Sequence, residues 1–450
     1  MLKKLVCLLL VCLILAGCGK TSADPTGGTT LPAGETQIGN TENSTEHTTD
    51  ATDETVSTTD AATKETNTEE ITSSVQNLPQ PISYWNPICN EYISLFPSTQ
   101  NTQTVAKIPK GATIGLVNWD GRFARVVYDG QVGYVYSNCL KPADANYFSD
   151  HLDILTPTTK YTYEQMQADM LEMQTLYPQF ITVSSIGRTA MDRDIPLMLV
   201  GDPNAKYQIL VQAAMHGREH FTAWIAMAMV DAMLKQGKLP GDVCYHIIPM
   251  SNPDGVHISQ TGQLDAIQMS IYESDVRYGY TSGSNLTEYA TQWKANALGV
   301  DVNRNFVVGW DGSDERPKPS CQRYRGSVPF STPEAMVLYE YTLSHTFHAT
   351  LSLHSHGSVI YHQYGTKQPV NRLSHSLAKA VQGVTGYVPT AYDNTTGAGY
   401  KDWVMDELGI PSLTVEIGST ATPIIQQDMY NTFDRCREML TAVYDWLTEN

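Results

Sequence analysis

The sequence predicts an α/β fold: a mixed, largely buried β-sheet flanked by helices, preceded by a small all-β barrel. Apolar strands alternate with helices over residues 151–450, as expected for a sheet that is covered by helices. Between residues 78 and 145, short strands of alternating polarity are joined by Asp-Gly turns, which indicates antiparallel pairing. Residues 19–77 contain no aromatic side chain, so we expect no core there.

Composition limits the classes of function. The chain has 450 residues and a formal net charge of −18, whereas a nucleic-acid-binding protein needs a concentrated basic surface. After residue 18 no apolar run approaches the roughly 20 residues of a membrane-spanning helix. The 25 Tyr, 9 Phe and 7 Trp are ample for buried cores. The composition therefore indicates a mildly acidic globular protein.

Residues 1–17 have the features of an export signal, with two lysines before an apolar run that ends in small residues. The ending Leu15–Cys18 resembles the lipobox of bacterial lipoproteins. That resemblance implies that Cys18 is acylated and anchors the chain to the outer face of the cytoplasmic membrane. A cleaved signal with a chance cysteine and a plain membrane anchor are the alternatives. Residues 18–77 carry 17 Thr and 11 acidic residues and are expected to be a disordered linker.

Export would place the remaining cysteines where disulfides are permitted. They are Cys89, Cys139, Cys244, Cys321 and Cys436, and their spacing fits neither a zinc ribbon nor a redox CxxC motif. The odd number leaves at least one without an intramolecular partner, and Cys89–Cys139 is the first candidate for a disulfide.

Residues 78–145 are expected to form the barrel. Strands are predicted over Ile114–Trp119, Phe123–Tyr128 and Gly133–Tyr136, with Asp-Gly turns between them. The turn order and the closing Gly-Tyr-Val resemble bacterial Src-homology-three-like domains, which implies a role in directing an enzyme to cell-wall peptides. A purely structural cap is the alternative.

The α/β part is predicted as one domain. Helices are expected over Tyr161–Tyr177 and Phe221–Leu234, and strands over Ile209–Met215 and Tyr245–Met250. The segment His216–His220 begins where the first of these strands ends, which is a usual place for the active site of an α/β protein.

The His216–His220 segment (His-Gly-Arg-Glu-His) permits three interpretations. In the H-x-x-E-H inverzincin signature, His216 and His220 would bind zinc and Glu219 would act as a base. In the H-x-x-E pattern of zinc carboxypeptidases, His216 and Glu219 would both be ligands. The third interpretation is a surface turn without a metal. Five residues do not decide among them.

Further motifs follow in order, and they are Asn252–Gly255, Trp293-Lys294, Asp301–Phe306, Leu351–Ser355 and Thr414–Gly418. Together they resemble the zinc metallocarboxypeptidase family over about two-thirds of the chain. The resemblance implies a metallocarboxypeptidase-like fold and one zinc ion per chain, held by His216, Glu219 and His354. Three protein ligands leave a fourth position open, as a catalytic zinc requires. His220 and His356 are then not ligands.

The resemblance also implies roles for residues around the metal. Asp301 would hydrogen-bond the first His ligand and fix its tautomer. Glu416, at the end of an apolar strand, would be the general base that takes a proton from water and passes it to the leaving amine. Asn303 and Arg304 would grip a substrate carboxylate, for which an Arg fork is well suited. Arg218 would belong to a neighbouring substrate subsite.

The sequence departs from the family pattern in places. The family's oxyanion donor is an Arg shortly before the Asp-x-Asn-Arg motif, whereas Lys294 stands here and supplies charge without a fork. The mobile Tyr of the family's lid loop is assigned to Tyr392, with Tyr400 as the alternative.

Lys401 is the predicted specificity residue, because the family residue before Asp-Trp lines the pocket for the side chain after the scissile bond. A Lys there favours a carboxylate-bearing side chain, such as that of diaminopimelate; the alternative is a solvated loop lysine. With the anchor, linker and barrel, this resembles the bacterial branch that cleaves γ-D-glutamyl-diaminopimelate bonds in the stem peptides of cell-wall peptidoglycan. The alternatives are a broad extracellular carboxypeptidase that trims exogenous peptides and a catalytically inactive wall-binding lipoprotein.

Overall fold

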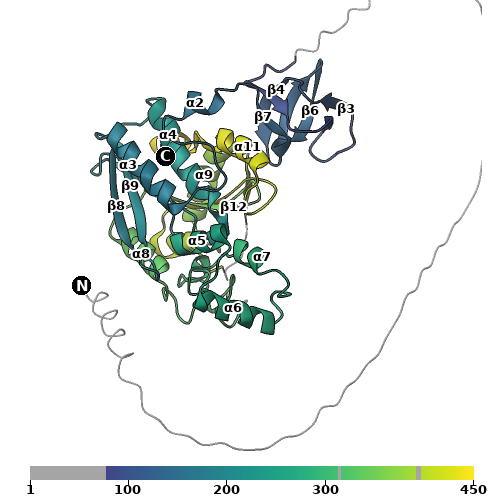
Figure 1. The fold of residues 1–450 in the computed structure, drawn as a ribbon. Helices are drawn as coiled ribbons and strands as arrows, with labels where there is room; N and C mark the ends of the chain where they lie inside the picture. The colour runs from purple at the N-terminus through teal and green to yellow at the C-terminus, as the bar shows by residue number, and fades with distance from the viewer. Residues whose placement is uncertain (1–77, 313–315, 392–396) are drawn as a thin grey trace, which may run out of the picture. The chain divides into compact units, whose positions relative to one another are not determined.

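The computed structural model describes residues 78–312, 316–391 and 397–450, which belong to one compact unit (Figure 1). The predicted export signal, Cys18 and the linker lie outside the described residues. Within the described part of the chain, no helix is long and apolar enough to cross a lipid bilayer.

The first described segment is all-β, as predicted. It forms a five-stranded sheet in the order β6-β5-β4-β1-β7 and a separate antiparallel pair, β2 and β3. The bounds are β1 Ser83–Pro87, β2 Tyr92–Leu95, β3 Ala106–Pro109, β4 Ile114–Asp120, β5 Phe123–Tyr128, β6 Gln131–Tyr136 and β7 Leu140–Pro142. Asp129 and Gly130 have φ angles of 48° and 72°, the left-handed conformation that a tight hairpin between β5 and β6 requires.

The described part of the structure contains no disulfide between Cys89 and Cys139, the pair that the sequence offers as the first candidate. Cys89 and Cys139 pack against the same small core at the β1 end of the all-β part, but both carry free thiols. Cys244, Cys321 and Cys436 are free and buried.

The second segment contains an eight-stranded mixed sheet in the order β14-β13-β15-β12-β10-β11-β9-β8. Its four central strands, β15, β12, β10 and β11, run parallel, while β9, β8 and β13 pair antiparallel. The bounds are β8 Ile181–Arg188, β9 Asp194–Gly201, β10 Tyr207–Ala213, β11 Val243–Ile248, β12 Ala349–Ser355, β13 Val359–Tyr361, β14 Val388–Thr390 and β15 Ser412–Ile417. The predicted mixed sheet is confirmed.

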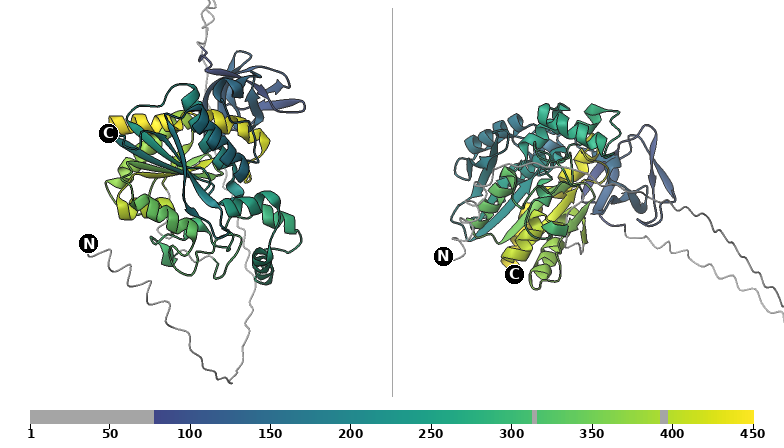
Figure 2. Two further views of the ribbon diagram at one scale, coloured as in Figure 1. Left: turned by 60° about the vertical axis from the view of Figure 1, so that its left-hand side comes forward. Right: turned by 90° about the horizontal axis from the view of Figure 1, so that it is seen from below.

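Helices cover both faces of this sheet (Figure 2). The helices of this segment are α2 Tyr147–His151, α3 Tyr163–Leu176, α4 Phe221–Lys235, α5 Pro253–Thr261, α6 Ala266–Arg277, α7 Leu286–Thr291, α8 Pro333–Leu343, α9 Val370–Thr385, α10 Tyr400–Trp403, α11 Gln426–Cys436 and α12 Met439–Glu449. Of these, α6 and α7 pack with α5 around a separate small core and do not cover the sheet. Side chains alternate between the faces along β10: Ile209 and Val211 contact the core under α3, α4, α9, α11 and α12, whereas Leu210 contacts the core under α8 and α10. The sheet is therefore buried on both sides.

The parallel strands bring distant motifs to one edge of the sheet. β10 leads into His216, β12 contains His354, and β15 contains Glu416, which pairs in register with His354. The carboxyl ends of neighbouring parallel strands meet at the same edge, where open α/β sheets bind ligands. The fold thereby assembles the predicted site from residues that are far apart in sequence.

Candidate active site

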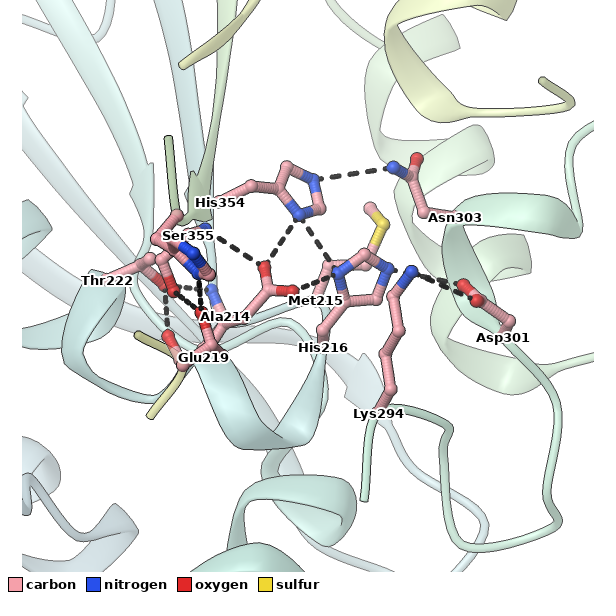
Figure 3. A network of polar contacts seen from close by, with 12 residues as sticks. Ala214, Met215, His216, Glu219, Thr222, Lys294, Asp301, Asn303, His354 and Ser355 are labelled. Atoms are coloured by element: carbon pink, nitrogen blue, oxygen red, sulfur yellow. Dashed lines mark hydrogen bonds and ion pairs between the residues drawn. The ribbon is translucent and has the colours of Figure 1, made fainter. Parts of the chain in front are cut away.

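His216, Glu219 and His354 converge on one point, with side chains 4%, 4% and 2% exposed (Figure 3). Oε1 of Glu219 lies 2.8 Å from Nδ1 of His216, and Oε2 lies 2.9 Å from Nδ1 of His354. The two Nδ1 atoms are 3.0 Å apart. Burial disfavours the charge of Glu219, but the two neighbouring histidines outweigh it and hold the pKa of this carboxyl well below its usual range.

A sharp turn after β10 orients the first two of these residues. Ala214 has a left-handed φ of 47°, which is strained for a residue with a Cβ. The Thr222 hydroxyl accepts from the Ala214 N–H at 2.8 Å and donates to the Glu219 carbonyl at 2.8 Å (Figure 3). The turn is thus fixed by hydrogen bonds from the start of α4, and His216 leaves the sheet edge in a defined direction.

The three side chains fit a zinc ion. Two imidazole nitrogens and a carboxylate oxygen are the donor set that zinc prefers, and their ligand atoms all lie within 4.8 Å of one another. The facing Nδ1 atoms of His216 and His354 require a proton or a cation between them. His220 is buried outside this cluster, its Nδ1 finds no hydrogen-bond partner among the described residues, and burial lowers its pKa to about 4. The structure therefore favours the ligand set of the carboxypeptidase pattern.

Asp301 occupies the predicted place behind the first histidine. Its Oδ1 lies 3.2 Å from Nε2 of His216, and its Oδ2 accepts from the Arg323 backbone N–H at 3.1 Å. The Lys294 ammonium is 3.3 Å from the same Oδ2 (Figure 3). Although Asp301 is fully buried, Lys294 and His216 hold its pKa well below the usual range. Lys294, the predicted oxyanion donor, thus also neutralises the carboxylate that orients a zinc ligand.

Glu416 lies next to the cluster on β15, as expected for a base. Burial, together with the neighbouring Glu219 carboxylate, raises the pKa of Glu416, against the opposing effects of His354, Lys294 and Arg218. A carboxylate with a raised pKa accepts a proton more readily than one with an ordinary pKa.

A cavity of about 320 Å³ opens beside the cluster. Its lining comprises His216, Lys294, Asn303, Arg304, His354, Tyr361, Gln363, Gly397, Lys401, Asp402, Thr414 and Glu416. Nδ2 of Asn303 lies 3.5 Å from Nε2 of His354 (Figure 3), and Oδ1 of Asn303 accepts from the Tyr400 N–H at 3.0 Å. Asn303, Arg304 and Lys401 are therefore brought together at one cavity, as the sequence predicts.

Lys401 is not a solvated loop lysine. Its side chain is 9% exposed, and its ammonium lies 2.5 Å from Oδ1 of Asp402 and donates to the Gln363 carbonyl at 2.9 Å. Asp402, Gln363, Tyr361 and Thr414 also line the cavity, and sequence reasoning did not identify them as lining residues. Two of them had a signal in the sequence: Asp402 is next to Lys401, and Thr414 begins the Thr414–Gly418 motif.

Other predicted residues are placed differently. Tyr392 lies outside the described residues. Tyr400, the alternative for a mobile lid, is wrong for that role, because its ring is fully buried and its hydroxyl lies 2.9 Å from that of Thr342. Arg218 does not line the cavity, but its charge acts on Glu416. His356 is exposed, and its Nδ1 lies 3.0 Å from the Thr422 hydroxyl.

Comparison with known proteins yields one family. The model of the zinc carboxypeptidase family matches residues 166–438, more than half of the chain. Gamma-D-glutamyl-L-diamino acid endopeptidase 1 of Lysinibacillus sphaericus is 30% identical over 278 residues, which are 59% of this chain and 67% of that protein. Mast cell carboxypeptidase A of Mus musculus is 25% identical over 262 residues, 52% of this chain and 57% of that protein.

A solved structure supports the fold. Bovine thrombin-activatable fibrinolysis inhibitor, in complex with tick carboxypeptidase inhibitor, matches with a TM-score of 0.51 at 17% identity. The match covers 68% of this chain and 100% of that chain. At this identity the likeness concerns the fold alone.

Proposed function

Because the chain belongs to the zinc carboxypeptidase family and is a zinc metallopeptidase, we propose that it hydrolyses amide bonds in the stem peptides of bacterial peptidoglycan. The bond proposed is the one between γ-D-glutamate and diaminopimelate. The observation that carries this proposal is the Lys401–Asp402 ion pair in the cavity beside the His-Glu-His cluster. The relative from Lysinibacillus sphaericus, whose name states a γ-D-glutamyl-L-diamino acid endopeptidase, supports the same substrate class.

The cavity suits a side chain that ends in two opposite charges. The side chain of diaminopimelate ends in an amino-acid group, which carries an ammonium and a carboxylate at neutral pH. Lys401 and Asp402 offer one charge of each sign, and Lys401 contacts the Asp402 carboxylate through Oδ1. A charge-assisted hydrogen bond to each would orient such a side chain. An apolar or singly charged side chain would leave one of the two residues without a partner on the substrate.

The chain's own residues supply the remaining chemistry. His216, Glu219 and His354 would hold the zinc ion, which would supply Lewis-acid chemistry at the scissile carbonyl and at water. Glu416 takes the proton of the attacking water at its carboxylate and delivers it to the nitrogen of the leaving amine, while the C–O bond forms and the C–N bond breaks. Arg304 binds a substrate carboxylate and Lys294 supplies positive charge beside the scissile carbonyl.

We propose further that the enzyme is exported and anchored by lipid on Cys18, with residues 18–77 as a tether. Cells given a labelled fatty acid should incorporate it into the wild-type chain. Cys18→Ser should abolish the label and shift the protein from the membrane fraction to the medium. Labelling of Cys18→Ser at the wild-type level would contradict the anchor.

Side-by-side digestion tests the substrate. Purified stem peptides and ordinary peptides are incubated with the enzyme, and the products are identified by mass spectrometry. The expected result is cleavage between D-glutamate and diaminopimelate, lost with a chelator and restored with zinc. Release of only C-terminal residues from ordinary peptides would establish the broad carboxypeptidase instead. Absence of cleavage from every substrate would establish the inactive wall-binding protein.

Lys401→Ala tests the specificity pocket. It leaves Asp402 without its cation, so kcat/KM for diaminopimelate substrates should fall about 10- to 150-fold, and a neutral analogue should be spared. Lys401→Glu should lower kcat/KM for diaminopimelate substrates further. Lys367→Ala is the matched control, because Lys367 also pairs with an aspartate but is 54% exposed and outside the cavity. Equal losses for charged and neutral substrates in Lys401→Ala would contradict the assignment.

A further inference from the structure

The all-β part meets the α/β part through the Asp120–Phe123 turn, which joins β4 to β5. The Gly121 N–H donates to the Gly386 carbonyl at 2.8 Å. The Arg122 guanidinium donates to the Ser419 carbonyl at 3.2 Å. One turn of the all-β part therefore contacts two loops of the α/β part, one after α9 and one after β15.

Arg435 of α11 clamps the same turn. Its guanidinium donates to the carbonyls of Gly121 and Phe123 at 2.7 and 3.2 Å. It also lies over two rings, 4.7 Å from the centre of Trp119 and 5.3 Å from that of Tyr387. The residue is 0% exposed, and a buried cation is stable only when hydrogen bonds and ring contacts replace water. The contact between Arg435 and the Asp120–Phe123 turn is therefore buried away from water.

Gly386 makes this close approach possible. Its φ is 64°, and a Cβ at this position would lie 2.4 Å from the carbonyl oxygen of Trp119. A side chain there would both strain the backbone and push β4 away. Gly386 thus marks the place where the two parts meet backbone to backbone.

These contacts reach the segment that follows Glu416. The Gly418 N–H donates to the Tyr387 hydroxyl at 3.3 Å, so the ring that packs on Arg435 also holds Gly418. The next residue, Ser419, accepts from Arg122. Gly418 is only two positions after Glu416, which pairs with His354 on β12 and with Val359 on β13.

We propose that the Asp120–Phe123 turn, clamped by Arg435, positions the Gly418–Ser419 segment and through it Glu416. Arg122 and Gly386 are then positioning residues for hydrolysis. The inference rests on the proposed function, in which Glu416 is the base. It predicts that the all-β part contributes to turnover of every substrate, including small soluble peptides, whereas a module that only binds the wall would matter for insoluble walls alone.

The principal test uses Gly386→Ala with Gly237→Ala as its matched control. Gly237 has a similar φ of 62°, and a Cβ there would meet no atom within 4 Å, so both variants bear the same backbone strain but only Gly386→Ala pushes on Trp119. On a soluble γ-D-glutamyl-diaminopimelate peptide, Gly386→Ala of the full chain should lower kcat roughly tenfold with KM little changed. Gly237→Ala should stay within about twofold of wild type. Zinc content should be equal in both.

Arg122→Ala perturbs the same contact without pushing on the backbone, because it removes only the hydrogen bond to Ser419. Arg125→Ala on β5 is its control, and Arg122→Lys, which keeps the positive charge, should restore turnover in part. Hydrogen exchange of the backbone amides of residues 417–420 should speed up in Gly386→Ala and Arg122→Ala, and stay unchanged in both controls. Wild-type kcat and wild-type exchange in Gly386→Ala and Arg122→Ala would overturn the inference. If wild type does not cleave the peptide while exchange responds as predicted, the proposed substrate fails and the positioning stands.

Discussion

The histidines near the His216–Glu219–His354 cluster differ in what they contact. His216 uses Nδ1 for the cluster and Nε2 for Asp301, whereas His220, four residues on, belongs to neither contact. His216→Ala and His354→Ala should abolish zinc binding, while His220→Ala should retain it. Zinc content measured by atomic emission on purified, folded variants checks this. Loss of zinc from His220→Ala as well as from His216→Ala would favour the inverzincin pattern instead.

Glu416 separates proton transfer from metal binding. Glu416→Gln keeps the shape of the side chain but removes its ability to accept a proton, so zinc content should be unchanged. Turnover should fall about 10²- to 10⁴-fold, the usual contribution of a general base. Steady-state kinetics together with zinc analysis check this. Near-normal turnover in Glu416→Gln would exclude the general-base role.

Among the elements, α5 and α7 offer a matched pair of helix starts. Each begins after an asparagine whose Oδ1 accepts from the backbone three residues on. Asn285 is exposed and makes that one bond, whereas Asn252 is buried and its Nδ2 also donates to the carbonyls of Met215 and Ala295. Asn252 therefore joins the end of β10 to the loop that follows Lys294.

This difference predicts unequal losses of stability. Asn285→Ala should lower the free energy of unfolding by about 1 kcal/mol, the value of a helix cap. Asn252→Ala should lower it by about 3 kcal/mol, because two buried carbonyls also lose a donor. Urea unfolding of the zinc-loaded proteins measures both. Equal losses would show that the two extra bonds of Asn252 contribute nothing.

For the whole molecule, a buried carboxyl on α8 predicts how stability depends on pH. Glu334 is 0% exposed; burial raises its pKa to about 7, against a hydrogen bond from Asn296. Because the folded-state pKa is raised, the folded protein binds more protons than the unfolded chain between about pH 4.5 and 7. The stability that wild type has below this window is therefore lost as pH rises through it.

Glu334→Gln removes this titration. From pH 5 to pH 8 the stability of Glu334→Gln relative to wild type should rise by up to about 3 kcal/mol. Glu340→Gln, on the exposed face of the same helix, is the control for the loss of one carboxylate from α8. Urea unfolding at the two pH values measures the difference. A relative stability that does not vary with pH would contradict the buried, titrating carboxyl.

Local pattern was sufficient for the elements around the site. The apolar segment Phe221–Leu234 predicts a helix, and α4 spans Phe221–Lys235. The prediction succeeds because an apolar run of this length, made of helix-forming residues, is too long for a typical strand. The ligand set was predicted through the resemblance to the zinc metallocarboxypeptidase family, because the His216–His220 segment alone left three interpretations open. Tyr400 could not be placed, since nothing near it in sequence shows that Thr342 and the α8–α10 core enclose its ring.

By itself, then, the sequence determined the α/β class and the presence of strands beside the motifs, and through the resemblance to the zinc metallocarboxypeptidase family it supplied the set of His216, Glu219 and His354. Only the tertiary structure decided that Lys401 is paired with Asp402 and Gln363 in the cavity, and that Arg435 closes on the Asp120–Phe123 turn. Arg435 and Gly121 are 314 positions apart. Strand and helix periodicity reports which face of an element is buried, but the partner that a buried charge finds depends on which distant segments the fold packs against it.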